Sequence, residues 1–255
     1  GLVNWVGAWT LYKKEVLRFL IVWIQTIFSP LISSLLFLLV LSLAIGADRA
    51  NVLGVSFINF LAPGLIAMQV IQQAFSHSSS SFMIGKIQGN IVDLLYAPLS
   101  ATEVTISITL AAVTRSLMIA FISIITFILI IDIQVKHHLL LILFTFLSSF
   151  ILGNIGIIAG LWAEKFDHMA TITNFVIIPL SFLSGTFYSI ERLPEYLQKI
   201  SEANPFFYMI DGFRYCFIDV ADGSIQTGIV YLVILSFISW LACYILFKKG
   251  YKIKT

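Results

Sequence analysis

LISSLLFLLVLSLAI, residues 31–45, is the stretch that decides the class of fold. Its apolar residues follow one another without the strict alternation that a strand of a membrane β-barrel requires, so the run indicates a helix. The rest of the chain has the same character, because 59 % of its 255 residues are hydrophobic and only 11 % are charged. An apolar run of about 20 residues is long enough to cross the hydrocarbon core of a bilayer. The sequence therefore predicts a membrane protein built from helices.

Six runs of this kind are expected to span the membrane. They lie near residues 24–45, 57–75, 104–131, 139–163, 171–188 and 226–247. Backbone polar groups find no water in hydrocarbon, so each run must satisfy its own hydrogen bonds by forming a helix. The prediction is an all-α membrane protein with six transmembrane helices in a single domain, 1–255. Six spans place both ends of the chain on the same side.

The distribution of Lys and Arg indicates which side that is. With six spans, nine cations fall on the side of the termini and five on the other; Arg115 is left out because it lies within a span. The nine are Lys13, Lys14, Arg18, Lys86, Lys165, Lys248, Lys249, Lys252 and Lys254. Loops rich in Lys and Arg stay in the cytoplasm. We therefore expect a multi-pass protein of the cytoplasmic membrane with both termini in the cytoplasm.

Residues 4–22, before the first span, have the pattern of an amphipathic helix. Aromatic and aliphatic residues recur at helical spacing from Trp5 to Leu20, and Lys14 and Arg18 fall on the opposite face. Such a helix lies in the membrane interface with its cations toward anionic lipid or a partner. Whether it only anchors the first span or also contacts a partner is left open by the pattern.

The motifs of common catalytic sites are absent from the sequence. It contains no GxxxxGK[ST], the loop that cradles nucleotide phosphates, and neither HExxH nor GxSxG. Two cysteines fit no disulfide framework or zinc pattern, and a net charge of +2 is too small to suggest nucleic-acid binding. We expect no catalytic residue and no metal ligand. Gly156 and Gly160 form a GxxxG pair, which is typical of two helices in close contact.

The segment from 189 to 217 is aromatic-rich, too short to span and interrupted by Asn204-Pro205. This pattern predicts a helical hairpin that re-enters the outer leaflet, where irregular backbone is tolerated only under cover of protein. Asp211 and Arg214, three residues apart, could form a local pair. The hairpin could simply close the outer end of the bundle, or it could form an external gate; the two roles are compatible.

A short amphipathic helix is also predicted over about 82–97, between the second and third spans. Its end carries the sequence GNIVDLLYAPLS, residues 89–100. Lys86, Asn90 and Asp93 share one face, and Leu94 belongs to the apolar face. The serine run 78–81 is expected to cap this helix, and Pro98 to end it. Periodicity alone allows a helix that merely links two spans.

Taken together, these features resemble the membrane subunits of type-two ABC exporters. The resemblance covers essentially the whole chain, and its most specific parts are DLLYAPLS at 93–100 and the segment from Gly185 to Tyr215. In that segment the residues that stand as in the family are Phe187-Tyr188, Leu193-Pro194, Asn204-Pro205, Tyr208 and Phe213-Arg214-Tyr215. The resemblance is nearest to the simple bacterial permeases that carry no ATPase domain in the same chain.

The resemblance implies a set of partners and of functional residues. Such permeases pair with a second copy of themselves in the lipid bilayer and sit on a dimer of separate ATP-binding subunits, which bind the ATP and Mg; no cofactor is expected in this chain. ATPase coupling would involve Lys14, Arg18, Lys86, Asn90, Asp93 and Leu94. The translocation path would be lined by the second and fifth spans, with Asn59, Gln69, Gln72, Thr173, Asn174, Phe175 and Phe182. The external gate would involve Phe187, Tyr188, Asp211 and Arg214.

A path with aromatic and uncharged polar side chains would suit an amphipathic lipid, a drug or a glycan-lipid as the exported substrate. Two alternatives to an ATP-driven exporter remain. One is an ion-coupled secondary carrier, although the spans carry no acidic relay and no clear internal repeat. The other is a membrane scaffold without transport, or an intramembrane enzyme, for which the catalytic motifs are missing.

Overall fold

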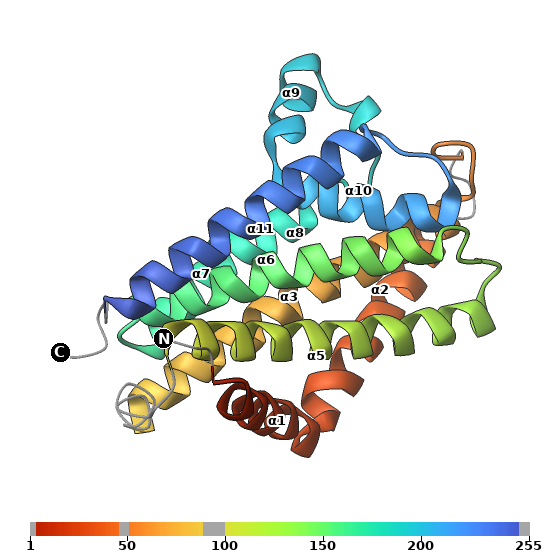
Figure 1. Cartoon of the computed structure of the whole chain (residues 1–255). Helices are drawn as coiled ribbons and strands as arrows, with labels where there is room; N and C mark the ends of the chain where they lie inside the picture. The colour runs from red at the N-terminus through yellow and green to blue at the C-terminus, as the bar shows by residue number, and fades with distance from the viewer. Residues whose placement is uncertain (1–3, 46–50, 89–99, 250–255) are drawn as a thin grey trace.

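A computed structural model of the chain describes residues 4–45, 51–88 and 100–249 (Figure 1). The first elements in chain order are α1 (Trp5–Ile21), η1 (Ile24–Phe28), α2 (Ser29–Ala44), α3 (Phe57–Gln88), α5 (Ala101–Ile130) and α6 (His138–Trp162). They are followed by α7 (Phe166–Ile172), η3 (Thr173–Ile177), α8 (Ile178–Phe182), η4 (Ile190–Arg192), α9 (Glu195–Ala203), α10 (Pro205–Ile218) and α11 (Ile225–Lys248). Within the described ranges the fold is helical apart from one isolated bridge between Val52 and Val55. The predicted all-α class is confirmed.

Five helices are long and apolar enough to cross a membrane. They are η1 with α2 (Ile24–Ala44), α3 as far as Ile84, α5, α6 and α11. Their bounds agree with the predicted spans at 24–45, 104–131, 139–163 and 226–247 to within three residues. The chain is therefore a multi-pass membrane protein.

The region of the predicted fifth span is built differently from a straight helix. Helical backbone runs without a break through α7, η3 and α8, from Phe166 to Phe182, so it begins and ends earlier than the predicted 171–188. Its middle, η3, is a π-helical turn that ends two residues before Pro179. Proline has no N–H to donate, and a π-turn accommodates the missing bond. The same arrangement recurs in η1, which ends two residues before Pro30.

Helix α3 is much longer than the predicted second span, 57–75. It continues for 32 residues to Gln88 and includes the serine run 78–81. These serines therefore lie inside a helix and do not cap a new one, so that expectation is wrong. The helical hydrogen bonds simply continue from the apolar span through a polar stretch. The remainder of the predicted coupling helix, 89–97, lies outside the described residues.

Helix α6 occupies the centre of the bundle and packs against α3, α5, α10 and α11. A Cβ placed on Gly156 would lie 2.7 Å from the carbonyl oxygen of Phe75, and one on Gly160 would lie 2.8 Å from Cβ of Phe82. Both neighbours belong to α3. Only glycine allows the two helices to approach this closely, so the predicted role of the GxxxG pair is confirmed.

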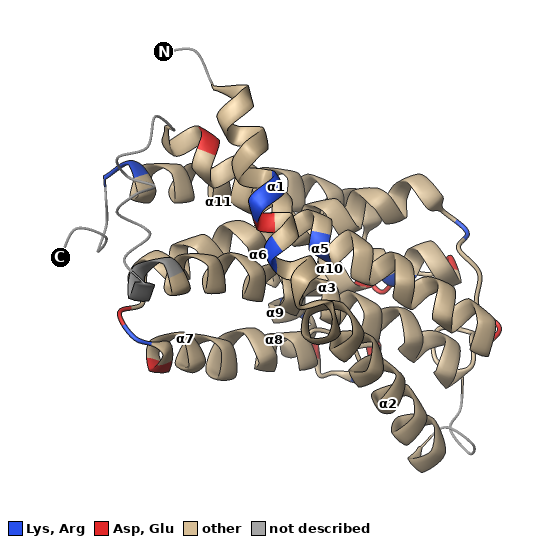
Figure 2. Ribbon diagram, turned by 90° about the horizontal axis from the view of Figure 1, so that it is seen from below, with Lys and Arg blue, Asp and Glu red and all other residues tan. Residues whose placement is uncertain are grey.

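Helix α1 crosses the bundle at one edge instead of following the long helices (Figure 1). Glu103 forms a capping box with Ser100 at the start of α5, and its carboxylate also accepts the backbone N–H of Asn4, the N-cap of α1. Farther along, Ser107 Oγ donates to the carbonyl of Ala8 at 2.9 Å. These contacts fix α1 against α5. Figure 2 shows that charged residues are sparse along the long helices and gather on α1 and at the ends of the bundle.

Candidate functional site

A polar cluster joins α1 to the second half of α3. Glu15 Oε2 lies 3.1 Å from Nε of Arg18 and 3.3 Å from Nε2 of His77. Ser81 Oγ donates to Glu15 Oε1 at 2.6 Å, and Arg18 donates to the backbone carbonyl of His77 at 3.2 Å. The His77 ring is fully buried and is not aligned with Glu15 as a hydrogen bond. One carboxylate on α1 thus contacts three residues, two of them on α3.

These contacts determine the ionisation of Glu15. Burial by itself raises the pKa of this carboxyl group, but the His77 ring, the Arg18 guanidinium and the Ser81 hydroxyl lower it further than burial raises it. The net effect lowers the pKa from its ordinary value of 4.5 to about 2. Glu15 is therefore a carboxylate at neutral pH, and on α3 it accepts the hydrogen bond from Ser81.

A buried cation lies deeper, between α3 and α5. Arg115 is 8 % exposed and donates to Oε1 of Gln73 at 2.6 Å. Sequence analysis only left Arg115 out of the charge count and did not anticipate Gln73 as its partner. The signal was available, because an Arg inside a span needs a polar partner on a neighbouring helix.

Only some of the residues predicted to couple to an ATPase lie in the part of the chain that the structure describes. Arg18 belongs to the α1–α3 cluster, whereas the side chain of Lys14 is exposed. Lys86 lies near the end of α3, but its side chain is outside the part of the chain that the structure describes. Asn90, Asp93 and Leu94 fall in residues 89–99, which are likewise not described. The coupling role of all six residues stays a prediction.

A cavity of about 450 Å³ lies between the α7–η3 segment and the part of α3 that continues beyond the predicted second span. Helix α3 contributes Ser76, Ser79, Ser80 and Met83, and the α7–η3 segment contributes Phe166, Met169, Ala170, Thr173 and Asn174. Two of the predicted path residues, Thr173 and Asn174, are therefore brought together here. The sequence predicts that the run 78–81 caps a helix, so it gives no indication that serines of α3 face this cavity.

The other predicted path residues do not line this cavity. Asn59 lines a separate cavity of about 300 Å³ near the opposite end of α3, together with Asp132 and Lys136. Gln69 is buried inside the bundle and Gln72 is half-buried. Phe182 stacks on Phe187, with ring centroids 5.4 Å apart.

Phe175 extends away from the bundle and is 77 % exposed. In the single chain it therefore lines no enclosed space. Its neighbour Asn174, which lines the cavity, is also exposed. This part of η3 presents one apolar and one amide side chain at the surface of the bundle.

At the opposite end of the bundle, Arg214 of α10 is the largest fully buried side chain. Its guanidinium donates to the carbonyl of Phe60 on α3 and to that of Thr186, each at 2.9 Å. It also lies 3.8 Å from the centroid of the Phe60 ring. A Cβ on Gly64 would lie 2.5 Å from this guanidinium, so glycine leaves the space that the arginine fills.

Asp211 and Arg214 do not form the local pair that their spacing allows. Among the described ion pairs there is none between them, and the carboxylate of Asp211 instead accepts the backbone N–H groups of Asp222 and Gly223 at 2.9 and 3.0 Å. Residues three apart on a helix can still point to different neighbours. Here Asp211 fixes the loop before α11, and Arg214 fixes α3.

Phe187 and Tyr188, the other predicted gate residues, lie in the turn after α8. Phe187 packs between Phe182 and Phe37 of α2, and the Tyr188 hydroxyl donates to the carbonyl of Leu183. The turn begins at Gly185, whose φ of +88° is a conformation that glycine adopts without strain. The four residues predicted for the gate are thus close along one end of the bundle, where α10 is packed beneath α9.

Comparisons with known proteins agree with this architecture. A family model described as ABC-2 type transporter matches residues 7–218. The chain is 32 % identical over 246 residues to the inner membrane transport permease YadH of Escherichia coli, covering 96 % of each protein. It is 25 % identical over 247 residues to nodulation protein J of Neorhizobium galegae, covering 94 % of this chain and 92 % of that protein. It is also 25 % identical over 222 residues to nodulation protein J of Rhizobium leguminosarum bv. viciae.

Proposed function

The chain belongs to the ABC-2 type transporter family as a membrane transport subunit, and we propose that two copies of it form the translocation path of an ATP-driven exporter. The ATP is hydrolysed by a separate ATP-binding subunit, and the chain itself carries no nucleotide-binding loop. We place the complex in a bacterial inner membrane with both termini in the cytoplasm. The printed name of the Escherichia coli relative supports the membrane, and the predominance of Lys and Arg on the terminal side supports the orientation.

The observation that carries this proposal is the cavity between α3 and α7–η3. Its wall includes three serine hydroxyls, a threonine and the amide of Asn174, yet it is formed by helices of a membrane bundle. Uncharged polar groups in a span need an internal partner or a hydrated space. Asn174 is exposed in the single chain, and contact of this amide with lipid tails would be unfavourable. A second copy would cover it and turn two half-cavities into a shared polar path.

The exposed apolar surface is consistent with a second copy on the same side. Leu43 of α2 is 76 % exposed and Phe175 of η3 is 77 % exposed. Helices α2 and α8 both pack against α3, which borders the cavity. We propose that α2 and the α7–α8 segment of each copy meet their counterparts there.

Energy from the ATP-binding subunits would enter through α1 and the segment 82–97. The α1–α3 cluster supports this route, because Glu15 and Arg18 link the interface helix to a helix that borders the cavity. A displacement of α1 would therefore act directly on α3. Asp93→Lys and Leu94→Asp are expected to leave membrane insertion intact but to uncouple ATP hydrolysis from transport.

The outer end of the path would be closed by α10 and the turn that carries Phe187 and Tyr188. Arg214 binds carbonyl groups of both α3 and the 183–189 turn, so these parts would move as one gate. For the substrate we propose an amphipathic lipid, drug or glycan-lipid. Uncharged polar groups beside aromatic and Met side chains at the cavity support that class.

The test is to purify the tagged chain from its native membrane and to assay ATP hydrolysis. We expect a separate ATP-binding protein to co-purify and to account for all the activity, with none in the chain alone. The proposal fails if the chain is isolated without any ATP-binding protein. Transport that follows an ion gradient in the absence of nucleotide would instead support a secondary carrier.

A further inference from the structure

We propose that a groove on the outer face of α5, α6 and α11 is a binding site for an anionic phospholipid of the surrounding membrane. One acyl chain would lie in the groove and the headgroup would lie beside α1. The proposal requires only that these helices span a bilayer, so it stands independently of the substrate and of the ATP-binding partner.

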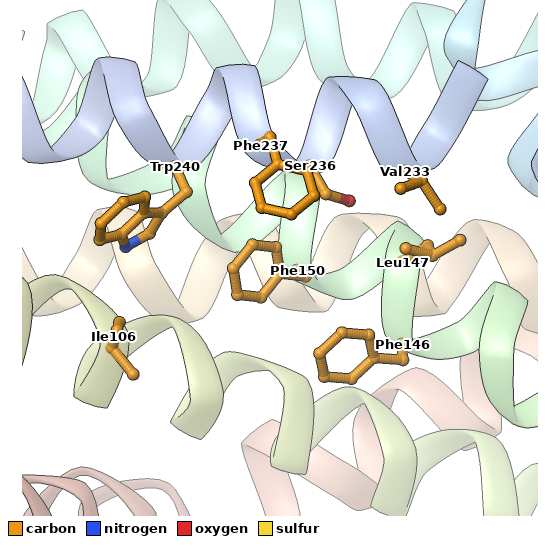
Figure 3. Close-up of a pocket in the computed structure, with 8 residues that line it drawn as sticks. All are labelled: Ile106, Phe146, Leu147, Phe150, Val233, Ser236, Phe237 and Trp240. Carbon is orange, nitrogen blue, oxygen red and sulfur yellow. The ribbon is translucent and has the colours of Figure 1, made fainter. Parts of the chain in front are cut away.

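The inner part of the groove is a cavity of about 360 Å³ between the three helices (Figure 3). Phe146 and Phe150 of α6 form its floor, with stacked rings whose centroids are 5.6 Å apart. Figure 3 shows Val233, Phe237 and Trp240 of α11 facing them across the space. Most of the lining side chains are hydrocarbon. The hydroxyl of Ser236 donates to the carbonyl of Leu232 at 2.8 Å, so its hydrogen-bond donor is already satisfied.

The outer part is a second cavity of about 450 Å³ between α1 and α5. Trp5, Trp9 and Tyr12 of α1 line one side of it. The two cavities share Ile106 and Phe146 in their walls, so they meet there. Together the two adjoining cavities, called the groove here, extend from the aromatic face of the interface helix to the flank of α11.

The dimensions of the groove favour an acyl chain over a protein segment. A helix about 10 Å across that rises about 1.5 Å per residue fills roughly 120 Å³ per residue. The inner cavity of about 360 Å³ is therefore too small for a helical segment. The groove faces outward, because Phe237 is 72 % exposed. Helix α6 separates it from α3 and from the polar cavity of the proposed path. An unfilled apolar groove forfeits dispersion contacts, and a flexible hydrocarbon chain restores them.

Two polar features identify the rest of the molecule. The indole Nε1 of Trp240 is buried and has no hydrogen-bond partner among the residues that the structure describes. Buried indole N–H groups normally find an acceptor, and an ester carbonyl at the head of an acyl chain would provide one. At the α1 end, Lys13 Nζ lies 5.7 Å from the centroid of the Trp9 ring. Its charge is complementary to an anionic headgroup.

The bound lipid would strengthen the contact between α1 and the bundle. The protein's own polar contacts between α1 and α5 include Ser107 with Ala8 and a 2.6 Å hydrogen bond between the Tyr12 and Thr114 hydroxyls. A chain packed against Trp9 and Phe146 would add apolar contact to both helices.

The test uses the full-length chain in nanodiscs of phosphatidylcholine that contain a minor fraction of phosphatidylglycerol with a photoreactive diazirine in one acyl chain. After irradiation, labelled residues are mapped by peptide mass spectrometry. We expect labelling to concentrate on α6 and α11 around Phe146, Phe150 and Phe237. Val233→Trp, which fills the groove, should reduce it severalfold. The matched control Ile238→Trp, on another exposed face of α11, should leave it unchanged.

Two further variants test the polar contacts. Trp240→Phe removes the N–H together with part of the ring, and should lower labelling although it leaves the groove more open. This variant keeps the proposal testable if Val233→Trp fails to fold. Lys13→Gln should reduce the preference for phosphatidylglycerol over the same diazirine on phosphatidylcholine by about fivefold, since a Lys beside an anionic surface contributes about 1 kcal/mol.

The proposal is overturned if labelling is spread evenly over the bilayer-facing helices, or if Val233→Trp and Ile238→Trp behave alike. It is also overturned if Val233→Cys forms a cross-link between two copies of the chain, because a second protomer would then cover the groove.

Discussion

The carboxylate of Glu15 on α1 lies 3.3 Å from Nε2 of His77 on α3, and this contact joins the interface helix to the longest helix of the bundle. Ser81, one turn farther along α3, donates to the other oxygen of the same carboxylate. The relationship gives α1 a mechanical connection to the wall of the polar cavity, because Ser79 and Ser80 lie between these two residues and line it.

Glu15→Gln should weaken the attachment of α1 in a pH-dependent way. Because the pKa of Glu15 in the folded chain is about 2 and its ordinary value is 4.5, the carboxylate contributes stability that is present above pH 4.5 and is lost as the pH falls toward 2. We expect the variant to be less stable than wild type at pH 7 by up to about 3 kcal/mol. The difference should shrink at pH 3.

The measurement is thermal unfolding of the purified chain in detergent at several pH values. Glu195→Gln is the control, since the side chain of Glu195 is 85 % exposed and its pair with Lys199 is a surface contact. Equal, pH-independent losses in the two variants would show that the Glu15 contacts add no stability.

Gly156→Ala should separate α3 from α6. The new Cβ would lie 2.7 Å from a backbone carbonyl oxygen of Phe75, which cannot rotate away, so we expect a loss of about 1–3 kcal/mol. Gly153→Ala, one turn earlier on α6, meets only side-chain atoms at 3.2 Å or more and should cost less. Unfolding midpoints of the two variants provide the comparison. The close-packing account is contradicted if Gly153→Ala is the more harmful change.

Arg214→Lys should destabilise the outer end of the bundle although it preserves the charge. Arg214 uses two separate N–H groups of its guanidinium to reach the carbonyls of Phe60 and Thr186, and the single ammonium of a lysine cannot reach both. That ammonium would also remain buried away from water. We expect a loss of about 2–4 kcal/mol, in line with charge-assisted hydrogen bonds broken in a buried site. Arg192→Lys, at an exposed position, should be near neutral. Proteolytic sensitivity of the α9–α10 region checks this, and similar sensitivity in both variants would argue against the role of Arg214.

Cysteine accessibility tests the polar cavity. Ser80→Cys and Asn174→Cys should react with a charged, membrane-impermeant maleimide added on the side of the termini, because both positions line the space between α3 and η3. Ile234→Cys, exposed on α11 in the apolar region, should react much more slowly. The native Cys216 and Cys243 are buried and should contribute little background. Protection of the cavity positions at the level of Ile234→Cys would mean that the space is not hydrated.

Most of the fold follows from local physics that the sequence displays. In a continuous apolar run of span length the backbone can satisfy its hydrogen bonds only by forming a helix. The helices at 24–45, 104–131, 139–163 and 226–247 could therefore be located to within a few residues. The role of the GxxxG pair could also be predicted, because small residues four apart on a membrane helix are typical of close contact with another helix. The boundaries of α3 could not be obtained in this way: its polar end, with Ser78–Ser81, has no apolar pattern to follow.

The site was less predictable because it depends on pairs of residues far apart in the chain. Nothing in the sequence near Glu15 indicates that His77 will face it, and Asp211 and Arg214 are close enough in sequence to suggest a pair that tertiary contacts prevent. In each case the partner is a group on another helix or a backbone N–H or carbonyl, and backbone partners leave no trace in the sequence. Thr173 and Asn174 could be identified because polar residues are conspicuous inside an apolar run.

The most direct test of the proposed mechanism is a cross-linking measurement at the predicted coupling segment. Asp93→Cys is introduced into the chain and treated with a short bifunctional thiol reagent in native membranes, with Glu195→Cys on α9 as the control for the opposite side. The account predicts that Asp93→Cys is joined to an ATP-binding subunit, with a yield that changes when ATP is added, whereas Glu195→Cys is not. Failure of Asp93→Cys to reach any ATP-binding protein, or equal cross-linking from Glu195→Cys, would contradict it.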